Sequence, residues 1–205
     1  MRTIWKATGL AAVGTLALHA LPASAQVQSG THELHVYAGE LFGDDLADTA
    51  ISGSRPELDD DFTFGARYGY NFTDTWGVEL SLGHSPNSVT RFAGGDIDLD
   101  ITTLDLDAVW HFNLGTRVVP YLIAGIGYAI ADLDRPIQGT VNGQPVLVRD
   151  DNGFTFNAGI GAKYFATERF VIRLEGRYRY VDKLVDAFDD SLNTFETTLG
   201  VGWLF

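Results

Sequence analysis

The chain has 205 residues, contains no cysteine and has a formal net charge of −13 at pH 7. Its length allows one ordinary domain with a small extra segment. The lack of cysteine excludes disulfides and thiolate metal sites, and the acidic balance argues against nucleic acid and anionic membrane surfaces as partners. We predict no cofactor and no nucleic-acid partner.

The beginning of the chain has the pattern of a secretory signal peptide. Residues 1–25 contain two bases and no acid, and an uncharged apolar run over residues 7–21 precedes the small-residue cleavage site Ala23-Ser24-Ala25. We expect cleavage after residue 25, so that residues 26–205 form the mature domain with a net charge of −15. No later stretch has about 18 uninterrupted apolar residues, so no transmembrane helix is expected.

Alternation with period two runs through the rest of the chain, and each segment has one apolar face and one small or polar face. The first segment alternates less cleanly, which leaves its inward face open. In chain order the predicted strands cover residues 33–42, 62–72, 76–83, 104–112, 121–130, 154–164, 170–180 and 193–205.

Short and long connections alternate between these strands. The long ones cover roughly residues 43–61, 85–97, 132–152 and 181–192. An even number of strands with short turns at one end and long loops at the other predicts an all-β fold, an eight-stranded antiparallel up-and-down transmembrane β-barrel. The pattern changes phase between Thr102 and Thr103, which indicates a bulge or a strand that continues beyond the membrane.

The direction of the apolar faces separates two kinds of barrel. A soluble barrel such as a lipocalin turns them into its cavity, whereas a membrane barrel turns them toward lipid. The aromatic residues favour the membrane, because they gather at both ends of the strands with mostly aliphatic residues between them. Beside the short turns lie Tyr70, Phe72, Trp76, Trp110, Phe112, Tyr164, Phe170, Trp203 and Phe205. Beside the long loops lie Phe42, Phe62, Phe64, Tyr128, Phe154, Tyr178, Tyr180 and Phe195.

The opposite faces carry ten charged residues that a membrane barrel would enclose. Enclosed charges are costly unless they are paired, and here five bases balance five acids. We predict an interior ion-pair network of Arg67, Glu79, Asp105, Asp107, Lys163, Arg173, Glu175, Arg177, Arg179 and Glu196. The network could also act as a gate, but eight strands leave little room for a continuous water path, which favours a structural role.

The charges of the long loops do not balance. The four long connections, counted with the strand ends beside them, contain 18 acids and five bases. We therefore expect long acidic loops outside the cell and both termini in the periplasm. The clusters at residues 44–45, 59–61 and 189–190 could bind Ca²⁺ or Mg²⁺, but a solvated acidic loop is favoured and no metal site is predicted.

Two segments and the end of the chain resemble a known family. The sequences at residues 119–128 and 173–180, together with the terminal aromatic residue, are similar to the small outer-membrane β-barrel proteins of Gram-negative bacteria, above all to the transmembrane domain of the OmpA-like family. The OmpW-like family is a near neighbour. The resemblance implies that the barrel-assembly machinery reads a C-terminal signal formed by Leu199, Val201, Trp203 and Phe205. A peptidoglycan-binding domain is not expected, because nothing in the chain matches the periplasmic domain of the full OmpA pattern.

We expect an integral outer-membrane protein with a structural or surface-display role and no catalysis. Its expected partners are outer-membrane lipid and lipopolysaccharide, and its expected state is a monomer. The alternative is a small pore or a ligand-binding barrel for small or apolar solutes. No catalytic residue is predicted, because the only His-Ser pair near the outer rim, His84-Ser85, consists of strand neighbours that point to opposite faces.

Overall fold

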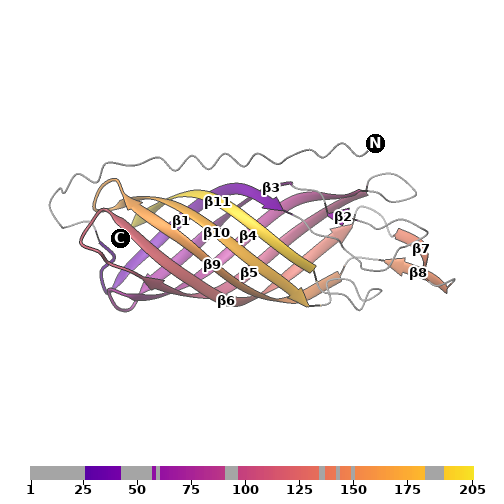
Figure 1. The fold of residues 1–205 in the computed structure, drawn as a ribbon, viewed down its shortest axis with the longest axis horizontal. Helices are drawn as coiled ribbons and strands as arrows, with labels where there is room; N and C mark the ends of the chain where they lie inside the picture. The colour runs from indigo at the N-terminus through magenta and orange to yellow at the C-terminus, as the bar shows by residue number, and fades with distance from the viewer. Residues whose placement is uncertain are drawn as a thin grey trace, which may run out of the picture.

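The computed structural model describes residues 26–42, 57–58, 61–90, 97–133, 137–141, 144–148, 151–182 and 192–205. The expected signal peptide and most of the four long loops lie outside these residues. Eight long strands form the wall of a barrel (Figure 1): β1 (Thr31–Phe42), β3 (Asp61–Asn71), β4 (Trp76–Thr90), β5 (Ile97–His111), β6 (Val118–Leu133), β9 (Asp151–Phe165), β10 (Phe170–Asp182) and β11 (Leu192–Leu204).

Each strand pairs antiparallel with its neighbours in the chain, and β1 closes the sheet against β11. The predicted eight-stranded up-and-down barrel is therefore confirmed. Closure continues past the last strand, because His32 and Phe205 each donate a backbone hydrogen bond to the other's carbonyl, at 2.9 and 3.0 Å. Within the described residues no helix is long and apolar enough to cross a membrane.

Three short strands belong to the loop end. β2 (Glu57–Leu58) pairs with the far end of β4. β7 (Ile137–Val141) and β8 (Gln144–Val148) pair with each other in a sheet of their own. Figure 1 places this hairpin at the opposite end of the barrel from the short turns and the C-terminus.

Strand β5 runs straight through the position where the sequence pattern changes phase. Its pairing with β4 is unbroken from Trp110 to Ile97, and its pairing with β6 is equally regular. The expected alternative of a bulge is therefore wrong, and the strand continues instead. Leu99 and Ile101 occupy the same buried face as Asp105. The inward-facing side chains of β5 thus change from polar to apolar toward the loop end, while the alternation of inward and outward positions stays the same.

The outward faces are apolar and exposed, as a lipid-facing wall requires. Leu106 is 56% exposed and Leu199 is 59% exposed. Aromatic rings meet at both ends of this surface. The indoles of Trp76 and Trp110 stack at 5.6 Å beside the short turns, and the rings of Phe42 and Phe195 lie 6.1 Å apart near the long loops.

The interior is apolar at its two ends and charged between them. At the loop end, the buried apolar residues are Leu41, Leu99, Ile101, Ala129, Ala131 and Val181, next to the buried polar Thr63, Ser85 and Asn87. At the turn end, Val27 from the segment that precedes β1 packs with Val119, Phe165, Val171 and Leu204. The amide of Asn113 holds this segment by donating to the Val27 carbonyl at 3.2 Å.

Two inward glycines make room for large buried rings. A Cβ on Gly202 would overlap the imidazole of His35, and one on Gly161 would overlap the phenol of Tyr121. Both rings are buried. Gly69 is also inward, but a Cβ there would have its nearest neighbour at 3.7 Å, an ordinary contact. The interior is therefore filled unevenly, and glycine is required at only some of its inward positions.

We expect Gly202→Ala to lower the free energy of unfolding by about 1–3 kcal/mol, because His35 must shift inside a filled interior. Gly69→Ala is the matched control and should change stability by less than about 0.5 kcal/mol. Urea unfolding of both variants after refolding into lipid vesicles measures the difference. Equal stability of the two variants would show that the ring of His35 does not need Gly202.

Candidate functional site

The barrel wall brings all ten sequence-predicted charged residues into its interior. They come from six strands, and none of the ten is more than 4% exposed. A buried charge needs a partner of opposite sign or several hydrogen bonds. The contacts divide the interior into a central group, a group toward the loops and a group toward the short turns.

The central group joins three arginines to two glutamates. The guanidinium of Arg173 binds Glu79 through both terminal nitrogens and reaches Glu175 Oε2 at 2.5 Å. The other oxygen of Glu175 lies 3.1 Å from Arg67 Nη2 and 3.0 Å from Arg177 Nε. Each glutamate is therefore shared among several guanidinium groups, so removing one cation affects more than one contact.

Two buried tyrosines complete this group. Tyr121 accepts a hydrogen bond from Arg173 Nε at 2.6 Å and donates one to Glu175 Oε2 at 2.6 Å. The guanidinium of Arg67 lies over the ring of Tyr37, 3.9 Å from its centroid, which is a cation–π geometry. Both phenols thus contact the ion pairs and fill the space beside them.

Toward the loops the network continues as a chain of pairs. Arg177 Nη1 lies 3.0 Å from Asp107 and 3.4 Å from Asp105. Arg179 Nη2 reaches Asp105 at 2.7 Å, and Arg179 Nη1 donates to Glu196. Neutral donors bind the second oxygens of both aspartates, because Asn157 donates to Asp107 at 2.9 Å and Thr155 donates to Asp105 at 3.2 Å.

Toward the short turns lies a separate group around Lys163. Its ammonium donates to Glu33 Oε2 at 2.6 Å and to His111 Nε2 at 2.9 Å. Glu33 also accepts from His35 Nε2 at 2.8 Å and from Asn71 at 2.7 Å. Among the described residues, Glu33 is the only acid paired with Lys163.

Sequence reasoning missed the first strand's contribution to this group. Glu33, His35 and Tyr37 all face inward and are buried, whereas the sequence pattern left the inward face of this strand open and the predicted network did not include Glu33. Among the described residues the interior therefore encloses six acids and five bases, and the expected equality of five and five is wrong. The missing signal was the pairing of β1 with β11, which sets Glu33 opposite Leu204 and His35 opposite Gly202.

Two further predicted features have clear positions. Ser85 points inward and donates to the Phe62 carbonyl at 2.9 Å, whereas His84 faces outward beside Thr102 Oγ1 at 3.1 Å. These two side chains are therefore not arranged as a nucleophile and its base. In the described part of the chain, no group of three or more His, Asp or Glu residues could hold a metal ion.

The residues of the expected assembly signal all lie on the outer surface. Leu199, Val201, Trp203 and Phe205 are between 42% and 64% exposed, on the face of β11 that would meet lipid. The backbone of Phe205 is paired with His32, and the two rings are stacked with centroids 5.7 Å apart. Recognition of this segment by the assembly machinery stays a prediction.

Comparison with curated proteins finds a related outer-membrane protein. Outer membrane protein PagN of Salmonella typhimurium is 29% identical over 140 residues, which cover 59% of this chain and 57% of PagN. The chain therefore matches little more than half of that relative's length.

Solved structures share the fold at low identity. Neisserial surface protein A is 16% identical, with a TM-score of 0.56 over 85% of this chain and 97% of that one. OprG of Pseudomonas aeruginosa is 17% identical, with a TM-score of 0.54 over 88% and 99% of the two chains. The predicted resemblance to small outer-membrane barrels is confirmed. Because the family model described as outer membrane protein beta-barrel domain matches residues 9–205, this chain belongs to that family and is an outer-membrane β-barrel.

Proposed function

We propose that the protein is a closed barrel that anchors acidic loops at the cell surface, supports the envelope and performs no catalysis. The observation that carries this proposal is the burial of the interior charges. A water-filled channel would expose the side chains that line it. Here even Glu196, the most exposed of the enclosed charged residues, is only 4% exposed. An interior filled in this way favours an anchor over a passage.

The interior network then has a structural role. Its charges come from strands far apart in the sequence, as in the contact of Arg173 on β10 with Glu79 on β4. Such contacts tie opposite parts of the wall together, because each partner would be buried without compensation if the other moved away. The same property argues against the alternative of a small pore, since a continuous path would require several pairs to separate at once.

Display of the loops follows from the two unequal ends of the barrel. The short-turn end is closed by the segment containing Val27, and the long connections leave from the other end. The excess of acids belongs to those connections. We infer that the termini lie in the periplasm and the acidic loops outside the cell. Outer-membrane lipid and lipopolysaccharide would surround a monomer that the barrel-assembly machinery has inserted.

The pair formed by Glu33 and Lys163 tests the structural role of the network. We expect Glu33→Gln to lower the free energy of unfolding by about 3–5 kcal/mol, because Lys163 keeps a buried charge without its acid. Adding Lys163→Met should recover most of that loss, since the unpaired charge is then gone. Urea unfolding in lipid vesicles measures Glu33→Gln, Lys163→Met alone and the double variant. Glu168→Gln, on an exposed turn, is the control and should change stability by less than about 0.5 kcal/mol.

The structural role would be contradicted if the stability losses of Glu33→Gln and Lys163→Met simply added in the double variant. The double variant would then be less stable than either single variant, as expected for two residues that contribute independently.

Epitope insertion tests the display of the loop end. A tag placed between Val141 and Gln144, in the β7–β8 hairpin, should bind antibody on intact cells. The same tag placed within residues 166–169, the short turn between β9 and β10, should bind antibody only after the outer membrane is permeabilised. Flow cytometry before and after permeabilisation measures both. Labelling of the short turn alone on intact cells would reverse the proposed orientation.

A further inference from the structure

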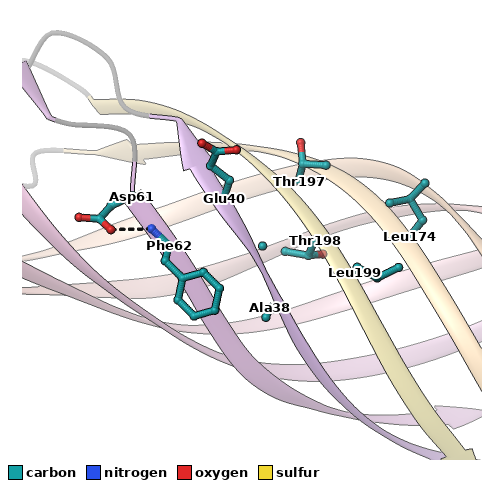
Figure 2. Close-up of a pocket in the computed structure, with 9 residues that line it drawn as sticks. Ala38, Glu40, Asp61, Phe62, Leu174, Thr197, Thr198 and Leu199 are labelled. Atoms are coloured by element: carbon teal, nitrogen blue, oxygen red, sulfur yellow. Dashed lines mark hydrogen bonds between the residues drawn. The ribbon is translucent and has the colours of Figure 1, made fainter. Parts of the chain in front are cut away.

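The outer wall has a groove that the closed interior does not explain. It has a volume of about 480 Å³, within the range of roughly 300–1,000 Å³ that is usual for ligand sites. Four neighbouring strands form it: β3, β1, β11 and β10. Its lining includes Ala38, Glu40, Phe62, Leu174, Thr197 and Leu199. Figure 2 shows Phe62 on one side of the groove, Leu174 on the other, and Glu40 toward the loop end.

Small side chains at outward positions create this groove. Thr197 on β11 pairs with Glu40 on one side and with Gly176 on the other. One outward position nearer the turns, Ala38 pairs with Leu199. The result is an apolar floor between larger side chains, on the surface that faces lipid.

The loop-side end of the groove is acidic. Glu40 is exposed and Asp61 is half-buried, and the residues that line the groove include no base. Phe42 is the next outward residue of β1 toward the loops, and its ring lies 6.1 Å from that of Phe195. Glu40 therefore lies just inside the aromatic belt, where the hydrocarbon gives way to headgroups. A carboxylate at this depth is tolerated better than at the bilayer centre, and a nearby cation would favour it further.

These features select one class of occupant. A second copy related by a two-fold axis would bring two Glu40 carboxylates into the same contact, and like charges oppose that. A headgroup with only phosphate charge would be repelled for the same reason. An acyl chain fits the apolar floor, and a primary ammonium can donate hydrogen bonds to the Glu40 carboxylate. We propose that the groove binds an outer-membrane lipid with a primary-amine headgroup, with its acyl chain beside Ala38 and Leu199 and its amine at Glu40.

The test compares two lipids that differ only at the headgroup nitrogen. Phosphatidylethanolamine has N–H donors, and in phosphatidylcholine methyl groups replace them. The full-length mature protein is refolded into phosphatidylcholine vesicles that contain a minor fraction of either lipid, brominated on its chains to quench tryptophan fluorescence. Phe62→Trp places a reporter at the groove. The wild-type protein provides the background, since Trp76, Trp110 and Trp203 lie at the turn end.

We expect the Phe62→Trp reporter to favour the brominated ethanolamine lipid by roughly twofold to tenfold, the range of one net hydrogen bond, because both lipids carry a cationic nitrogen but only this one has N–H donors. Adding Glu40→Gln should abolish this preference while the barrel still refolds, because Glu40 is on the surface. Adding Ala38→Leu, which fills the floor, should reduce quenching by both lipids. Tyr128→Trp is the matched control, since it lies near the loop end of β6, opposite β1 in the strand order, and should show no preference.

Three results would overturn the proposal. They are equal quenching by the two lipids at the Phe62→Trp reporter, a preference that survives Glu40→Gln, and the same preference at the Tyr128→Trp reporter. Unchanged quenching with Ala38→Leu would likewise exclude the groove as the place where the chain lies. The lipid site depends on the outer wall alone, so its failure would leave the proposed closed anchor intact.

Discussion

The enclosure of charge inside a narrow barrel is the constraint on which the rest of this structure depends. Closing eight strands satisfies the backbone of the wall but leaves an interior only wide enough for side chains. In the part of the chain that the structure describes, six acids and five bases lie in that space, all nearly inaccessible to solvent. Buried charges that have lost their water must be paired with charges of opposite sign. The shared contacts of Glu175 with Arg67, Arg173 and Arg177 are the direct consequence.

Packing inside the barrel explains why glycine occupies some inward positions and why the interior is apolar at both ends of the barrel. The rings of His35 and Tyr121 leave no room for a Cβ at Gly202 and Gly161, respectively, so glycine at these positions reflects the side chain that lies opposite. At each end the charged interior gives way to apolar side chains, with Val27 contributed by the segment that precedes the first strand. The interior is thus held by ion pairs in the middle and by hydrophobic contacts where it approaches water.

Much of this arrangement can be predicted from the sequence because a strand has a simple period. Once the apolar faces are assigned to lipid, the inward position of Arg177 or Asp105 follows directly. The first strand resisted this reasoning because its small and polar residues occur on both faces, so Glu33 was not predicted to join the interior network. Only its register with β11 settles the direction. The change of pattern near Thr102 also left two interpretations open. The inward positions of β5 become apolar there, but the backbone of the strand continues without a bulge.

Other features of the structure depend on residues of neighbouring strands, so no local pattern in the sequence predicts them. The wall groove is lined by Ala38, Leu174 and Thr197, which come from three strands, although Leu174 and Thr197 are 23 positions apart in the chain. The hydrogen-bond partners within the interior network likewise depend on residues that are distant in the sequence. Sequence alternation says that Lys163 points inward, but only the closed barrel brings it to Glu33.

Single-channel recording tests the central claim most directly. The mature protein, refolded and inserted into a planar bilayer, should show no steady stepwise conductance, because paired and buried charges leave no continuous water path. Arg177→Ala, which leaves several acids without a shared cation, should be less stable and is the variant in which conductance is expected. Regular, long-lived conductance steps of the unmodified protein would contradict a closed interior.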